Sequence, residues 1–105
     1  MSNGVDYSEK GESDKTIRVH ELRIENEHYD AIREGIMTHE VLFNDRGFKK
    51  GALLVMHRYN PITRERVGGA LTARVSCVMT HEDLPHAIKD GYCVMSIKFM
   101  HEYEL

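Results

Sequence analysis

The sequence lacks the features that mark membrane-spanning, multidomain and disulfide-stabilised proteins. No apolar run approaches the roughly 20 residues that a membrane helix needs, so we expect no membrane contact. The 105 residues have room for one domain with one modest core. Cys77 and Cys93 lie too far apart for a CxxC redox or zinc pair, and no secretory signal precedes them. We therefore expect a cytoplasmic protein in which both cysteines are small buried side chains, with a disulfide as the alternative.

Net charge is also scarce, because the formal value is only −3, and this gives no global attraction to nucleic acid. The charge is unevenly distributed, however. Residues 1–15 carry four acidic and two basic side chains, and residues 21–40 carry six and two. Residues 44–74 carry two acidic and seven basic side chains, a local balance of +5. These seven are Arg46, Lys49, Lys50, Arg58, Arg64, Arg66 and Arg74. A basic surface of this kind favours contact with a phosphate backbone, and solvated turns are the alternative.

Recognisable catalytic and metal-binding motifs are absent. Seven histidines form no HxH, HExxH or Cys/His cluster, so we expect no metal ion and no cofactor. His20, His39 and His57 fall in predicted strands, where a half-buried imidazole commonly forms a hydrogen bond with the backbone or with a carboxylate. Glu21 and Glu40 are candidates for acid or base chemistry if they face each other, and for capping or salt bridges otherwise. No phosphate-binding glycine loop or nucleophile elbow selects an enzyme class.

Hydrophobic patterning predicts a small α+β or barrel-like domain over residues 16–105, preceded by a flexible tail at 1–15. Strands are expected at 16–24, 38–43, 52–59, 70–80 and 92–100, with an exposed hairpin at 64–69 and a bend or bulge at Gly68-Gly69. A helix capped by Asn26 should end at Gly35. A second short helix should begin at Thr80, where Asp83 completes a capping box, and end at Gly91.

Several segments carry a family resemblance. They are VHELRI, YDAIREG, THE, FNDRGFKKGALL and GYCVMSI, and together they span about residues 18–98. The sequence resembles a small family of prokaryotic and phage ASCH-related domains of unknown function with a PUA-like fold. The resemblance implies a small β-barrel of five to six strands with two short flanking helices. It also implies RNA binding and recognition of single or modified bases.

The same resemblance suggests a ligand-binding pocket. Thr38 and Glu40 match family positions near its expected mouth, and Asn44 and Arg46 belong to the distinctive NDR loop. Some ASCH-like proteins are acetylcytidine amidohydrolases that use a lysine beside this threonine and glutamate. Met37 occupies the place of that lysine, and a thioether cannot activate a nucleophile, so the resemblance speaks against this activity.

Our leading expectation is a nucleic-acid-binding module for RNA, a single strand or an unstacked base. Thr38, Glu40, Asn44 and Arg46 would line the pocket, while Lys49, Lys50, Arg58, Arg64, Arg66 and Arg74 would contact the backbone. One alternative is a protein-interaction or phage-type inhibitor module, indicated by apolar Met37 and Leu42 in place of cations. The other is a nucleoside amidohydrolase or ribonuclease with catalytic Thr38 and Glu40.

Overall fold

The computed structural model describes residues 17–104, so the flexible tail predicted for residues 1–15 lies outside the described part of the chain. Five strands and one helix follow in order. They are β1 (Val19–Glu25), α1 (Asn26–Arg33), β2 (His39–Phe43), β3 (Leu53–Tyr59), β4 (Arg66–Thr80) and β5 (Tyr92–Tyr103). Within residues 17–104 no helix has the length and apolar character of a membrane span.

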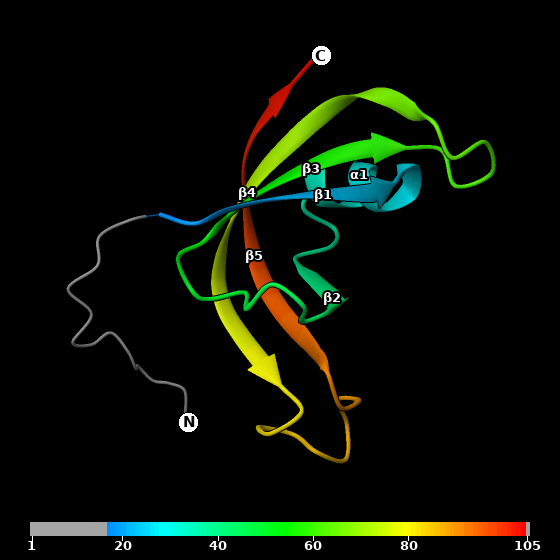
Figure 1. The fold of residues 1–105 in the computed structure, drawn as a ribbon. Helices are drawn as coiled ribbons and strands as arrows, with labels where there is room; N and C mark the ends of the chain where they lie inside the picture. The colour runs from blue at the N-terminus through cyan, green and yellow to red at the C-terminus, as the bar shows by residue number, and fades with distance from the viewer. Residues whose placement is uncertain (1–16, 105) are drawn as a thin grey trace.

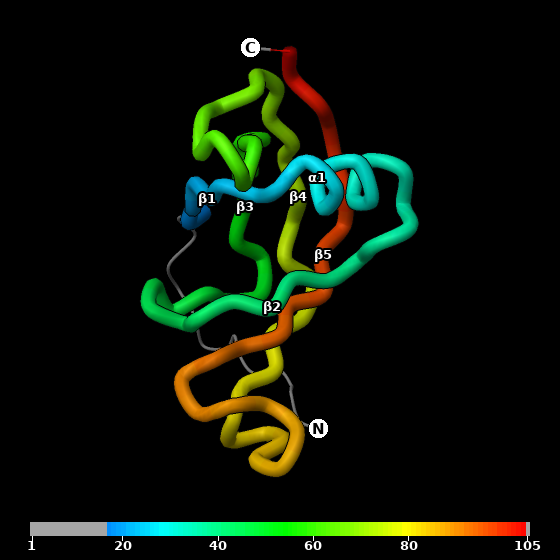
Figure 2. The backbone as a smooth tube through the Cα atoms, turned by 90° about the vertical axis from the view of Figure 1, so that its right-hand side faces the viewer, coloured from blue at the N-terminus to red at the C-terminus, as the bar shows by residue number. Residues whose placement is uncertain are grey.

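The strands form one sheet in the order β1-β3-β4-β5-β2, which curls into a half-barrel (Figure 1). β1 and β3 are parallel, and the other neighbours are antiparallel. Register shifts between Thr72 and Ala73, and again between Val75 and Cys77, interrupt the β4–β5 ladder. Bulges of this kind bend a strand and increase its twist, so the two longest strands can curve around the core (Figure 2).

Strand alternation fixes which face of the sheet is buried. In β1 Leu22 and Ile24 are buried, whereas Glu21, Arg23 and Glu25 are exposed. The inward face packs against α1, whose buried residues are Tyr29 and Ile32. Among residues 17–104 no helix covers the outward face of β1 and β3, and the charged side chains of β1 on that face are exposed.

The predicted bend at Gly68-Gly69 is confirmed. Both glycines have positive φ, at 100° and 91°, and the β3–β4 register shifts between His57 and Tyr59. A Cβ atom on Gly69 would lie 2.8 Å from the Tyr29 hydroxyl, so glycine allows α1 to approach the sheet closely.

The helix predicted for residues 80–91 is wrong, because Thr80 ends β4 and the residues after it form turns. The capping interaction is present, since the Thr80 N–H donates to Asp83 Oδ2 at 2.8 Å. Pro85 lacks the N–H that a continuing helix would need there, and the next turn closes separately through Ile88 N–H and Leu84 O. The fold therefore has one flanking helix where the sequence predicted two.

Three smaller predictions also change. The cap of α1 is Glu25, and Asn26 is its first residue. β4 begins at Arg66, so only residues 64 and 65 of the hairpin predicted for 64–69 lie in the connection between β3 and β4. Both cysteines are free; Cys93 is buried as expected, whereas Cys77 is only half-buried. These differences shift boundaries and leave the strand order of the domain unaffected.

Candidate functional site

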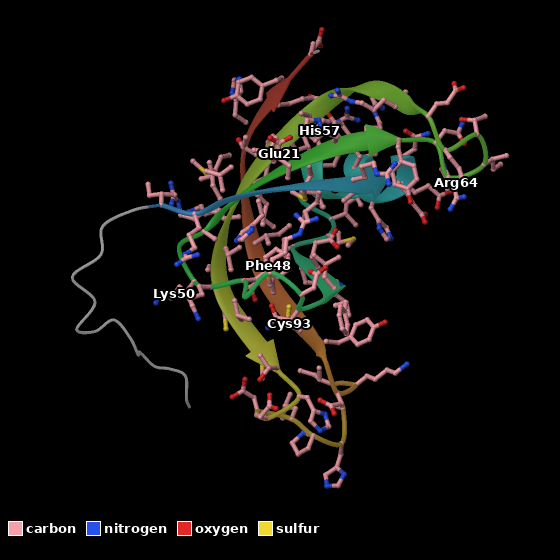
Figure 3. The ribbon with its side chains drawn as sticks, viewed as in Figure 1. Glu21, Phe48, Lys50, His57, Arg64 and Cys93 are labelled. Atoms are coloured by element: carbon pink, nitrogen blue, oxygen red, sulfur yellow. The ribbon has the colours of Figure 1, made fainter. Side chains whose placement is uncertain are left out.

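An open depression of about 380 Å³ lies on the outward side of β1, β3 and β4. Its lining residues are Glu21, Leu22, Arg23, Arg46, His57 and Arg66. The parallel register places Arg23 of β1 beside His57 of β3, and the segment after β2 supplies Arg46. Figure 3 shows Glu21 and His57 close together on this side of the sheet.

A chain of hydrogen bonds orders the centre of the depression. His57 Nε2 lies 2.8 Å from Glu21 Oε1, and Arg66 Nη2 lies 2.8 Å from His57 Nδ1. A guanidinium can only donate, so Nδ1 must accept from Arg66 and the ring proton must sit on Nε2. In this arrangement His57 donates to Glu21 and orients Arg66. The prediction that His57 contacts a carboxylate is confirmed.

Arg46 is positioned by the turn that follows β2. The Asn44 side-chain oxygen accepts the Phe48 N–H at 3.0 Å, and the buried Phe48 ring packs edge-to-face on His20. From this anchored turn, Arg46 Nη1 reaches across to the backbone oxygen of Glu21 at 2.6 Å. The NDR loop thus holds its guanidinium at the rim of the depression.

Positive charge and an aromatic ring meet at this face. Arg23, Arg46 and Arg66 contribute three positive charges and Glu21 one negative charge, so the arginines and the glutamate together give +2. The Arg23 guanidinium carbon lies 5.6 Å from the centre of the Tyr59 ring, within cation–π range. Tyr59 itself is half-buried. The face can therefore attract anions and offer a stacking surface.

The predicted pocket residues are not all brought together. Arg46 lines the depression, but Thr38, Glu40 and Asn44 do not. Thr38 is exposed and Asn44 fixes its own turn. β1 and β2 form opposite edges of the sheet, so Glu21 and Glu40 are not neighbouring carboxylates in the sheet. The Glu21 carboxylate instead contacts the His57 ring, with Oε1 2.8 Å from Nε2.

Glu40 is buried, with 4% of its surface exposed, and its Oε2 atom has no hydrogen-bond partner. Burial raises the pKa of its carboxyl, and His28 and His39 oppose that shift. Met37 and Leu42 are partly buried and pack against the core. Their suggested place at an apolar cleft mouth stays a prediction. Glu40 is a buried carboxyl that does not line the depression beside Glu21.

The predicted backbone-contacting cations occupy several places. Arg66 lines the depression, and Lys49 and Lys50 are exposed on the connection that carries Arg46. Figure 3 shows Lys50 and Arg64 at opposite ends of β3. Two others have structural partners: Arg58 lies 4.5 Å above the Tyr29 ring, and Arg74 Nη1 donates to Gly51 O at 3.0 Å.

Sequence reasoning missed Arg23 and the roles of Glu21 and His57 in the depression. Their signal was the alternation in β1, which points Glu21 and Arg23 to the same side. The parallel pairing of β1 with β3, which brings His57 beside them, leaves no local signal in the sequence. Within residues 17–104, no three His, Cys, Asp or Glu side chains group in a way that would hold a metal ion.

One family matches the greater part of this fold. The sequence model of a domain of unknown function, DUF3850, matches residues 19–97. The chain belongs to the DUF3850 family. The match begins with the first residue of β1 and ends within β5, so the DUF3850 domain includes every residue that lines the depression. A search among curated proteins finds no match to the chain.

Proposed function

We propose that this DUF3850 domain binds single-stranded nucleic acid, RNA above all, on the outward face of β1, β3 and β4. The observation that carries the proposal is the convergence of Arg23, Arg46 and Arg66 in one depression beside the Tyr59 ring. Three separate parts of the chain supply these cations, and Arg23 lies outside the basic stretch 44–74.

The chemistry of the face suits a phosphodiester strand. Guanidinium groups present planar donor forks to phosphate oxygens, and Arg66 is already oriented by His57. An unstacked base can lie on an aromatic ring while its phosphates follow neighbouring cations, a combination typical of single-strand binding. Lys49 and Lys50 extend the positive surface beyond Arg46. With a net charge of −3 for the whole chain, binding should be local and sensitive to salt.

The motif resemblance supports the same proposal. If the resemblance holds, the curled sheet is the PUA-like sheet of an ASCH-related domain, and domains of that class are associated with binding RNA and single bases. A base-reading role for Thr38, Glu40 and Asn44 stays a prediction beside it, and the phosphate-binding part rests on Arg46 and Arg66.

The proposal is tested by fluorescence anisotropy with a labelled single-stranded RNA and the matching DNA, each titrated over a range of salt concentrations. Arg46→Ala and Arg66→Ala should each weaken binding and reduce the slope of log K against log salt by about 0.7. Lys89→Ala is the matched control, because it removes one exposed charge from the turn between β4 and β5, away from the depression. Absence of a complex at low salt, or an equal loss in the control, would overturn the proposal.

A further inference from the structure

His57 joins two oppositely charged side chains of the depression through its two ring nitrogens. Nε2 lies 2.8 Å from Glu21 Oε1, and Nδ1 lies 2.8 Å from Arg66 Nη2. The bond to Glu21 survives the gain of a proton, because Nε2 still carries its own proton in the imidazolium ring. The bond to Arg66 does not, because Nδ1 accepts it and a protonated Nδ1 has no lone pair left to accept. Protonation of His57 therefore keeps the contact with Glu21 and releases Arg66.

The charges around His57 make its protonation sensitive to a bound anion. The charged and titratable side chains of this face come from β1, β3, β4 and the connection after β2, and they are Glu21, Arg23, Tyr59, Arg66, Asp45 and Arg46. The three guanidinium groups oppose a further positive charge, and the carboxylate on Nε2 favours it. His20 is also near Arg46, but its ring packs edge-to-face on Phe48 and does not line the depression. A phosphate entering the depression would offset the arginine charges and favour the protonated form of His57.

We propose that His57 takes up one proton from solvent when a backbone phosphate enters the depression, and that Arg66 then moves from His57 to that phosphate. This step rests on the proposed function, since the phosphate is part of the bound RNA. In the free chain Nδ1 accepts from Arg66. In the complex Nδ1 carries the added proton and donates to a phosphate oxygen, beside Arg66, while Nε2 still donates to Glu21. The bound face thus has one more positive charge and one more donor than the free face.

This exchange makes RNA binding depend on pH in a defined direction. The complex holds one more proton than the free chain, so a lower pH favours the complex. Arginine side chains keep their charge at every relevant pH, and binding by them alone would be insensitive to pH. Histidine is the side chain whose charge ordinarily changes between about pH 5 and 8. Affinity should consequently rise as the pH falls through this range.

The test measures the affinity for a single-stranded oligouridine RNA by fluorescence anisotropy, at about pH 6 and about pH 8 and at one ionic strength. Uracil bases and phosphodiesters keep their charge over this range, so a change in affinity arises in the protein. The wild-type chain should bind about tenfold more tightly at the lower pH. His57→Gln should bind equally at both, because its amide can accept from Arg66 and donate to Glu21 but gains no proton. His57→Lys is charged at both pH values, so it should also lose the pH dependence and should bind more tightly than His57→Gln at the higher pH.

His86→Gln is the matched control, because His86 is an exposed histidine in the turn between β4 and β5, away from the depression. It should keep the pH dependence of the wild type. Circular dichroism checks each variant, and His57→Lys replaces His57→Gln in the comparison if the glutamine variant unfolds. Nitrogen-15 spectra of the histidine rings at about pH 7 then show the proton directly. His57, assigned by its absence from His57→Gln, should have an unprotonated Nδ1 in the free chain and protons on both nitrogens in the saturated complex.

The outcomes separate this step from the binding on which it rests. A complex that forms equally well at both pH values, or a pH dependence that His57→Gln leaves unchanged, would overturn the proton uptake and leave RNA binding standing. A saturated complex with an unprotonated Nδ1, or a pH dependence that His86→Gln abolishes, would do the same. Absence of a complex at both pH values would overturn both proposals.

Discussion

Replacing Gly69 by alanine tests how closely α1 is held against the sheet. Gly69 has a φ of 91°, and a Cβ atom there would lie 2.8 Å from the Tyr29 hydroxyl oxygen. That hydroxyl is buried and donates to Glu102 Oε2 at 2.8 Å. Burial and this acidic neighbour raise the pKa of Tyr29 to about 12, so the hydroxyl keeps its proton at neutral pH. Alanine must therefore both adopt an unfavourable backbone angle and displace a bonded hydroxyl.

The two effects have separate magnitudes. An L-residue in the left-handed region costs about 1–2 kcal/mol, and a buried hydroxyl that loses its partner costs about 1–3 kcal/mol. Gly69→Ala should accordingly lower the free energy of unfolding by about 2–5 kcal/mol. Tyr29→Phe removes the oxygen that meets the new Cβ, after which the nearest ring atom is Cζ at 3.4 Å. In the Tyr29→Phe background the same alanine should cost only the backbone part.

Urea denaturation of the wild-type chain, both single variants and the double variant measures this coupling. We expect the double variant to be more stable than the sum of the single effects predicts, by about 1–3 kcal/mol. Two single effects that add to within about 0.5 kcal/mol would refute the argument that the glycine is needed for the approach of Tyr29.

Two further predictions concern Glu40 and Tyr59. Burial raises the folded-state pKa of Glu40 above its ordinary 4.5, so the unfolded chain binds fewer protons between the two values and stability falls as pH rises through that window. Glu40→Gln should remove this loss, so its free energy of unfolding relative to the wild type should be higher at pH 8 than at pH 4. Denaturation of both proteins at both pH values measures this, and an equal difference at the two pH values would contradict it. Tyr59→Ala should weaken RNA binding by about 1–3 kcal/mol per stacked base while leaving the salt slope unchanged. A reduced slope would mean that Tyr59 acts through the neighbouring Arg23.

The sequence allowed most strands to be predicted, because their alternation and β-branched content are local signals. The segment 52–59 became β3 nearly as expected, and Gly68-Gly69 produced the predicted irregularity. The second helix failed although its capping bond formed, since Thr80 and Asp83 stabilise a single turn as well as a helix. Pro85 then decided between the two outcomes.

The candidate site was harder to predict because it depends on strand pairing. Arg46 and Arg66 were identified from local charge, and both reached the depression. Glu21, Arg23 and His57 join them only because β1 pairs in parallel with β3, across a connection that includes α1 and β2. Conversely, Thr38 and Glu40 are close in sequence but have different environments, because Thr38 is exposed just before β2 begins, whereas Glu40 lies within β2 on its buried face.

The position of β1 has a consequence for the dynamics of the depression. β1 is held to the sheet through β3 alone, and its first pair, Val19 with Leu53, spans a long stretch of chain. An edge strand with one partner is among the first segments to open. Opening of β1 removes Glu21 and Arg23 while β3, β4 and β5 stay paired. A ligand that bridges Arg23 and Arg66 would therefore also fasten the first strand to the rest of the domain.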